Sequence, residues 1–189
     1  MPLPYEFELD DSRLSLLEKI KPGDACVEIG VFKGDFSECI IKMDPSKLHL
    51  IDPWDSIMDV PARWHATSQE EMNSIKQEVV DKFSSNPKVS IIEKYSVDAL
   101  DDFADESLDW VYLDANHSYS FVVQDLSNWW EKIKPGGFIC GNAYQDDNFH
   151  VEVLDFGVIE AVDSFTEDSF DSIEDFEVFS TQFLINKSI

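Results

Sequence analysis

Residues 26–34 read CVEIGVFKG, a short apolar run that ends at the acid Glu28 and leads into two glycines four residues apart. The pattern predicts a buried strand, a tight turn and a helix that runs through Lys42. Gly30 lets the backbone leave the strand with dihedral angles that other residues avoid. Gly34 permits close approach at the helix start, whose free amides favour a polar or negatively charged ligand group. A turn that holds no ligand explains the spacing equally well.

This turn differs from the dinucleotide-binding fingerprint, which needs three glycines as G-x-G-x-x-G for a pyrophosphate at the helix N-terminus. The second glycine of that fingerprint is replaced here by Phe32, whose ring would crowd a pyrophosphate. An acid-x-Gly-x-x-x-Gly turn resembles instead the first motif of class I methyltransferases that depend on S-adenosylmethionine (AdoMet), a ligand without phosphate.

Composition bounds the class of protein. A chain of 189 residues with 43% hydrophobic residues and five Trp fits one folded domain. We expect that domain to span residues 1–189, with residues 1–23 as an arm and helix and residues 24–189 as the core. The formal net charge of −25 argues against nucleic acid and membranes as partners, because phosphate binding needs clustered Lys and Arg. The charge indicates a solubilising surface, or some acids that bind a metal or cationic ligand.

Three scattered cysteines without CxxC spacing, and the lack of a signal peptide, favour a reducing compartment and predict a cytoplasmic protein. No apolar run approaches the roughly 20 residues of a membrane span.

Hydrophobic periodicity and turn signals predict an α/β fold. The expected strands lie at residues 25–29, 47–52, 88–93, 107–114, 138–142, 175–179 and 182–186. The expected helices lie at residues 10–20, 35–42, 68–83, 99–103, 119–132 and 157–165. Such alternation indicates a single-domain, Rossmann-like, doubly wound and mostly parallel seven-stranded sheet whose C-terminal strand is antiparallel.

Three details accompany this assignment. Residues 134–137, KPGG, predict a sharp turn before the fifth strand. Helical spacing predicts an apolar stripe in the first helix formed by Leu14, Leu17 and Ile20. The same spacing predicts a core stripe in the fourth large helix formed by Phe121, Val122, Leu126 and Trp129.

Polar residues and glycine gather where the predicted strands end. Ligands of open α/β sheets bind outside the carboxyl ends of the central strands. The residues at those positions are Glu28, Gly30, Asp52, Ser96, Asp114 and Asn142. Asp52 follows the glycine turn by about 20 residues, where an acid can accept two ribose hydroxyls; capping of the next turn is its alternative role. Trp54 flanks an adenine or belongs to the core.

Several stretches together resemble one family, namely residues 28–34, 51–54, 108–119, 125–130 and 134–141. They are similar to class I AdoMet methyltransferases, specifically the small methyltransferase family 24 group, which is related to metal-dependent O-methyltransferases of the catechol and sugar type. The similarity spans about residues 24–165, and residues 109–141 are its most specific part.

The resemblance implies AdoMet as cofactor and a set of contacts for it. Those contacts are Glu28, Gly30, Phe32, Gly34 and Ser37 for the methionine end, Asp52 and Trp54 for the ribose, Ser96 and Val97 for the adenine, and Asp114 near the sulfonium. It also implies Asp114 and His117 as catalytic residues, with His117 at the mouth of the site as the remaining candidate base. A histidine that only shapes the loop is equally compatible with the pattern.

A divalent metal such as Mg²⁺ is implied by the metal-dependent relatives, with Asp114 and Asn142 as its ligands here. Those relatives carry Gly-Asp-Asp-Tyr after the fifth strand, whereas this chain has GNAY at residues 141–144. Asn142 still offers a carbonyl oxygen, but Ala143 offers no ligand. Asp146 and Asp147 would complete the site only if their loop folds back.

These observations favour an AdoMet-dependent O-methyltransferase that acts on a small hydroxylated molecule, a sugar or a phenol. A binding or interaction protein with a degenerate active site is the second hypothesis, and a nicotinamide-dependent reductase is the third. The sequence leaves a homodimer open, with Trp64 or Trp130 as candidate interface residues.

Overall fold

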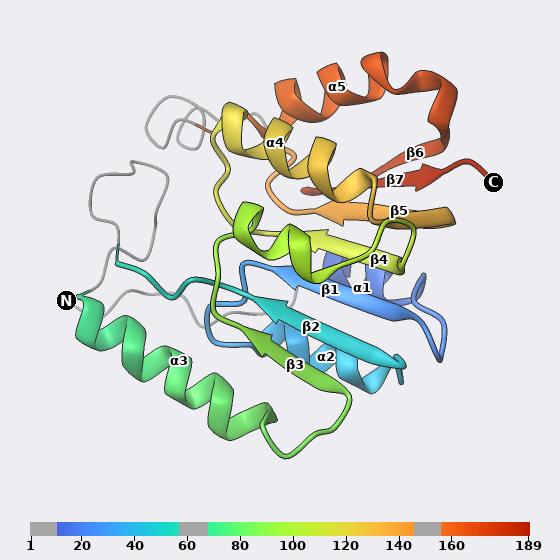
Figure 1. Cartoon of the computed structure of the whole chain (residues 1–189). Coiled ribbons are helices and arrows are strands. Elements are labelled where there is room, and N and C mark those ends of the chain that lie inside the picture. The colour runs from blue at the N-terminus through green and yellow to red at the C-terminus, as the bar shows by residue number, and fades with distance from the viewer. Residues whose placement is uncertain (1–10, 57–67, 146–155) are drawn as a thin grey trace.

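The computed structural model describes residues 11–56, 68–145 and 156–189 (Figure 1). In chain order, the helices and strands are α1 (Asp11–Leu17), β1 (Ala25–Ile29), α2 (Asp35–Lys42), β2 (Lys47–Ile51), α3 (Gln69–Phe83), β3 (Val89–Ile92), the 3-10 helix η1 (Val97–Asp102), β4 (Leu108–Leu113), α4 (Tyr119–Trp130), β5 (Ile133–Gly141), α5 (Val158–Asp168), the 3-10 helix η3 (Phe170–Ser172), β6 (Ile173–Phe179) and β7 (Gln182–Lys187). Every strand predicted from sequence is present, although the bounds of several differ.

The strands form one seven-stranded sheet in the order β3-β2-β1-β4-β5-β7-β6. Strands β1 to β5 pair in parallel, and β7 pairs antiparallel with both β5 and β6. The predicted mixed, doubly wound sheet is therefore confirmed. The order reverses between β1 and β4, so the loops that follow these two strands diverge at the carboxyl edge, where ligands of such sheets bind.

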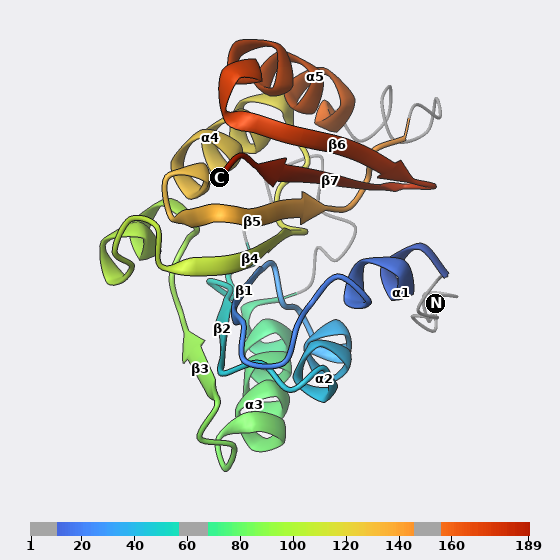
Figure 2. The ribbon, with the colours of Figure 1, turned by 90° about the vertical axis from the view of Figure 1, so that its right-hand side faces the viewer.

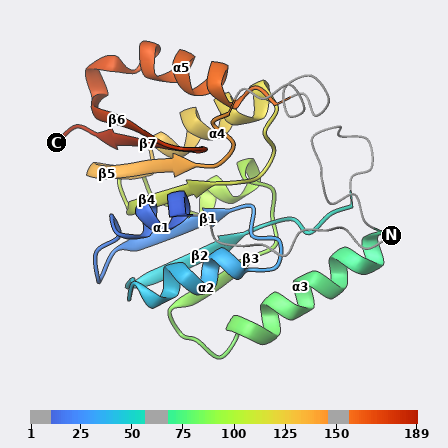
Figure 3. The ribbon, with the colours of Figure 1, turned by 180° about the vertical axis from the view of Figure 1, so that it is seen from behind.

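Helices cover both faces of the sheet. Figures 2 and 3 show α1, α2 and α3 on one face, with α4 and α5 on the other. Each face has its own buried apolar cluster, because side chains alternate along every strand. On β1, Val27 and Ile29 belong to the cluster beneath α4 and α5, whereas Cys26 faces the other helices. Glu28 shares the face of Cys26 by the same alternation and is 2% exposed.

Aromatic packing fixes the position of α2 against the sheet. Trp110 and Tyr112 on β4 stack with ring centroids 5.9 Å apart, and Phe36 of α2 lies 4.6 Å from the Tyr112 ring. Such pairs stabilise a core beyond the area that they bury. Among the described residues, no helix is both long and apolar enough to cross a membrane.

Strand β5 differs from the prediction, because residues 134–137 lie inside it and do not form a turn before it. Leu108 pairs with Ile133, whereas Trp110 pairs with Phe138, so a bulge absorbs the extra residues of β5. Gly136 adopts the left-handed conformation there, with φ of 77°. The turn chemistry of this segment therefore makes a bulge within a paired strand.

Two predicted apolar stripes need correction. Val122, Leu126 and Trp129 are buried in α4, but Phe121 is 49% exposed. Consecutive residues of a helix point about 100° apart, which turns Phe121 to one side of the face formed by Val122, Leu126 and Trp129.

α1 ends at Leu17, before the predicted end at Ile20; Leu17 and Ile20 are buried as predicted, whereas Leu14 is 45% exposed. Trp130 is also buried, with its ring 5.4 Å from that of Phe165, so it is not the interface residue suggested by the sequence. Trp64 lies outside the described residues.

Candidate functional site

The turn after β1 lies directly against the loop after β4. Gly30 has φ of 88°, and a Cβ at this position would overlap the carbonyl group of Asp114 and lie 2.8 Å from the Ala115 nitrogen. The glycine is therefore required by contact between two segments of this chain. A Cβ at Gly34, with φ of 74°, would lie 2.8 Å from the Phe83 ring, so this glycine permits α3 to pack. Neither requirement needs a ligand.

Three residues other than glycine also adopt left-handed backbone conformations at the carboxyl edge of the sheet. Phe32 follows β1 with φ of 50°, Trp54 follows β2 with φ of 44°, and Ala143 follows β5 with φ of 65°. Such conformations cost free energy and cluster at ligand-binding and catalytic sites. Their shared location marks this edge of the sheet as the candidate site.

Asp52 holds two of these loops together. Its Oδ2 accepts hydrogen bonds from the amides of Val31 and Phe32 at 2.9 and 3.0 Å, and its Oδ1 accepts one from the Trp54 amide at 2.7 Å. The capping role foreseen as an alternative is thus present. Oδ2 thus already accepts two bonds and Oδ1 one, so of the roughly four acceptor sites of the carboxylate one remains, on Oδ1, for a ribose hydroxyl, and that role stays a prediction.

Glu28 and Ser37 form a buried pair beneath the turn. The Ser37 hydroxyl donates to Glu28 Oε2 at 2.5 Å, and Ser37 is 0% exposed. Burial raises the pKa of Glu28 to about 8, although the hydrogen bond from Ser37 opposes this shift. The burial of Ser37 argues against the predicted contact with a ligand carboxylate, and its visible role is to hold Glu28.

Two predicted adenine contacts differ in exposure. Val97 is 44% exposed, whereas Ser96 is half-buried. The Ser96 hydroxyl donates to Asp125 Oδ1 and accepts from the Trp129 indole N–H at 2.7 Å. Burial raises the pKa of Asp125 to about 6, against the effect of the Ser96 hydrogen bond. Trp54 is 1% exposed and donates its indole N–H to the Phe32 carbonyl at 2.9 Å, so the core role is the one observed.

An open groove of about 460 Å³ lies where β2 and β3 end, a volume typical of small-molecule sites. Its lining residues are Pro53, Asp55, Gln69, Glu93, Lys94, Tyr95 and Asp98. The Tyr95 hydroxyl donates to Asp55 Oδ2 at 2.6 Å, which joins the loops after β3 and β2. Neither residue was singled out from sequence, although both directly follow predicted strands.

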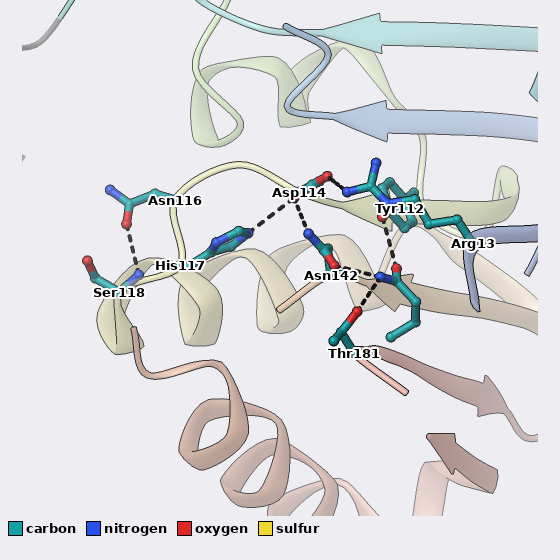
Figure 4. A network of polar contacts seen from close by, with 9 residues as sticks. Arg13, Tyr112, Asp114, Asn116, His117, Ser118, Asn142 and Thr181 are labelled. Atoms are coloured by element: carbon teal, nitrogen blue, oxygen red, sulfur yellow. Dashed lines mark hydrogen bonds and ion pairs between the residues drawn. The ribbon is translucent and has the colours of Figure 1, made fainter. Parts of the chain in front are cut away.

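Asp114 is the centre of a charged network at the end of β4 (Figure 4). Arg13 of α1 donates from Nη2 to Asp114 Oδ2 at 2.7 Å, and Asn142 donates from Nδ2 to Oδ1 at 3.2 Å. Burial alone would raise the pKa of Asp114, but Arg13, followed by His117 and Asn142, outweighs burial and holds that pKa below its usual range. Arg13 is a site residue that no sequence motif indicated.

The oxygen of Asn142 is also engaged. It accepts from Gln182 Nε2 at 2.5 Å, and Gln182 Oε1 accepts from the Tyr112 hydroxyl at 2.9 Å. Both predicted metal ligands therefore use their oxygens within the chain, and the described residues contain no group of three or more His, Cys, Asp or Glu that could hold an ion. This donor set does not fit a divalent metal. Asp146 and Asp147 lie outside the described residues.

The contacts of His117 fit the loop-shaping alternative, and its role as a base stays a prediction. Its Nε2 lies 3.2 Å from Asp114 Oδ1, a distance that gives an ion pair when the imidazole is protonated, without the alignment of a hydrogen bond. The ring packs edge-to-face on Phe156 at 4.6 Å, and its carbonyl accepts from the Gly157 amide at 2.9 Å. His117 also lines a small cavity together with Asp125 and Asn142. It therefore shapes the loop and faces a cavity.

A family model described as a methyltransferase domain matches residues 27–144, more than half of the chain. The chain belongs to this methyltransferase family. The match confirms the resemblance to class I AdoMet-dependent methyltransferases and AdoMet as the cofactor. The comparison with curated proteins gave no match.

Solved structures support the methyltransferase fold at low sequence identity. A candidate rRNA methylase from Clostridium thermocellum has a TM-score of 0.67 at 15% identity, with 97% of this chain and 99% of that chain covered. An N-methyltransferase, NodS, from Bradyrhizobium japonicum has a TM-score of 0.62 at 14% identity over 94% and 93% of the two chains. An O-methyltransferase from Thermotoga maritima has a TM-score of 0.63 at 12% identity over 98% and 68%.

The contact between Gly30 and Asp114 makes a stability prediction with a matched control. Gly23 has a similar φ of 96°, but no atom lies within 4 Å of its would-be Cβ. We expect Gly23→Ala to lower the free energy of unfolding by about 1–2 kcal/mol, the cost of a left-handed residue. Gly30→Ala adds the overlap and is expected to cost more than about 3 kcal/mol. Equal losses in urea denaturation would contradict the close approach.

Glu28 gives a pH prediction. Its pKa is raised from 4.5 to about 8, so between these values the folded protein holds a proton that the unfolded chain has lost. The contribution of Glu28 to the free energy of unfolding therefore falls as pH rises, by about 1.4 kcal/mol for each pH unit. Glu28→Gln should gain stability relative to the parent across this window, whereas Glu78→Gln, on an exposed part of α3, should not. Parallel pH profiles for all three proteins in urea denaturation would be inconsistent with a protonated Glu28.

Proposed function

We propose that this methyltransferase transfers the methyl group of AdoMet to a hydroxyl of a small molecule, a sugar or a phenol. The observation that carries the proposal is the convergence of three strand ends. Asp52 bonds the turn after β1, and Gly30 of that turn lies against Asp114 at the end of β4. A ligand at this turn would contact the ends of β1, β2 and β4 together.

The contacts suggest how AdoMet would lie along this edge. The turn around Gly30, with the buried Glu28 beneath it, would face its methionine end, and Asp52 would accept from the ribose. The adenine would enter the groove beside Tyr95 and Val97, which have exposed fractions of 38% and 44%. Asp114 and His117 would then lie at the reaction end.

When bound, AdoMet would supply an electrophilic methyl group on a positively charged sulfur, for transfer to the acceptor oxygen with neutral S-adenosylhomocysteine as the leaving group. His117 would take the hydroxyl proton as general base. The ionised Asp114, 3.2 Å away, would stabilise the imidazolium that results. The rest of the site positions the two reactants, which is the larger part of such catalysis.

One observation favours the second hypothesis, a binding protein that has lost catalysis. Asn142 and Ala143 stand where metal-dependent relatives have acids. The negative charge of Asp114 is balanced by the positive charge of Arg13. The nicotinamide hypothesis has less support, because Phe32 stands at the second glycine of the dinucleotide fingerprint. The net charge of −25 argues against RNA as the acceptor.

Calorimetric titration with S-adenosylhomocysteine tests the cofactor site. Asp52→Ala should weaken binding at least about tenfold, because the ribose contact and the bonds that hold the turn are both lost. Asp105→Ala, which removes only the surface ion pair with Lys132, should bind as the parent does. Lack of binding to the parent would overturn the proposal, and affinity for NAD in its place would support the reductase hypothesis.

A methyl-transfer screen with labelled AdoMet tests the chemistry. For any accepted sugar or phenol, His117→Gln should lower kcat by about 10²- to 10⁴-fold, the usual contribution of a general base. Its affinity for S-adenosylhomocysteine should stay close to that of the parent, since His117 lies at the reaction end. If the parent binds the cofactor but methylates nothing in a broad panel, the binding-protein hypothesis takes precedence.

A further inference from the structure

We propose that Arg13 occupies the cation position at the reaction end of this site, so that the guanidinium replaces a divalent metal and the reaction needs none. The inference rests on the proposed function for the role of Asp114 at the reaction end. The occupancy of the cation position itself is decided by the contacts of Asp114, and it is measurable without turnover.

The guanidinium of Arg13 is held in place by an ion pair and by two aromatic rings. Nη2 of Arg13 lies 2.7 Å from Asp114 Oδ2, and Arg13 is 8% exposed although it comes from α1, 101 residues away. Its carbon Cζ lies 5.5 and 5.8 Å from the ring centroids of Phe36 and Tyr112, within the range of cation–π attraction. Aromatic rings on two elements and a carboxylate on a third surround the positive charge.

Helix α1 is packed firmly enough to deliver this charge. Leu16, Leu17 and Ile20 are at most 5% exposed and belong to the cluster that also contains Phe36 and Tyr112. Residues three and four positions apart share a helix face, so Arg13 lies on the same face as Leu16 and Leu17. This packing holds the backbone beside the loop after β4, so the guanidinium reaches Asp114 without any movement of the helix.

Asp114 Oδ1, the oxygen that does not contact Arg13, faces the NH₂ group of Asn142, and this donor stands where a metal ion would have to bind. The ionised Asp114 only accepts, so Asn142 must turn its NH₂ group toward it and its oxygen away. That oxygen accepts from Gln182 Nε2, which leaves Gln182 Oε1 to accept from the Tyr112 hydroxyl. A chain of donors thus points toward Asp114, and a metal ion would meet the amide hydrogens of Asn142 where it needs an oxygen.

The replacement changes what the site offers an acceptor. A metal acts as a Lewis acid and lowers the pKa of a bound hydroxyl, whereas a guanidinium contributes a fixed positive charge and hydrogen-bond donors. Arg13 is therefore a positioning residue that keeps Asp114 ionised beside His117. Proton removal then depends on His117 alone.

The test uses Mn²⁺ as the probe, with free Mn²⁺ followed by electron paramagnetic resonance. The strongly acidic surface will bind Mn²⁺ weakly, so the parent is compared with Asp114→Asn, with and without S-adenosylhomocysteine. We expect the two proteins to give the same titration, because Asp114 holds no ion. A tighter Mn²⁺ site in the parent that Asp114→Asn abolishes would overturn the proposal.

A gain-of-site variant provides the converse measurement. Arg13→Ala combined with Asn142→Asp should create a Mn²⁺ site at least about tenfold tighter than any in the parent, and addition of Asp114→Asn should remove it. A folded double variant without such a site would overturn the proposal. Circular dichroism shows whether each variant is folded. If the variant with Arg13→Ala does not fold, Arg13→Gln is used in its place. If neither variant folds, the comparison of the parent with Asp114→Asn decides. Failure to bind S-adenosylhomocysteine would instead count against the proposed function and leave the Mn²⁺ comparison unchanged.

Discussion

A partly buried negative charge where the sheet order reverses constrains the whole carboxyl edge. Asp114 follows the central strand β4, and its backbone lies against Gly30 while its side chain, 18% exposed, meets Arg13. Removing most of a carboxylate from water costs free energy unless a positive charge lies beside it, so the fold brings Arg13 to this point. That requirement ties α1, the turn after β1 and the loop after β5 to one point. Phe32, Trp54 and Ala143, with left-handed backbone conformations, lie at the same edge of the sheet. Such backbone strain is typical of ligand-binding and catalytic sites.

The sequence predicted the elements best where a local signal agreed with tertiary pairing. β1 and α2 have the predicted bounds, because an apolar run, two glycines and an amphipathic segment all indicate the same boundaries. β5 begins before its predicted start, since pairing with β4 overrides the turn chemistry of residues 134–137. Leu14 and Phe121 were assigned to buried stripes by helical spacing, but the structure leaves 45% and 49% of them exposed, because spacing gives the period of a stripe and not which residues at its margin meet the core.

The candidate site was predictable in location but only partly in its contacts. Strand ends follow from topology, so Glu28, Asp52 and Asp114 could be named as a group. Ser37 is buried beneath the turn on the inner face of α2, and Trp54 turns its ring into the core, although the resemblance implied ligand contacts for both. The partner of Asp114 lies 101 residues away, beyond any local pattern. One signal was available, because Arg13 precedes Leu16 and Leu17 at helical spacing and so interrupts a buried face.

The chain of hydrogen bonds that links Tyr112, Gln182 and Asn142 to Asp114 has a consequence for how the protein folds. Arg13 belongs to the first described helix, and Gln182 begins the last described strand, so the reaction end joins distant parts of the polypeptide. Contacts of such high sequence separation form late in folding, after their loop-closure entropy has been overcome. A chain that has folded only β1, α2 and β2 would present the glycine turn and Asp52, but neither the groove after β3 nor Asp114. The cofactor site and the charge network both need β4, so neither would be complete until that strand has paired with β1.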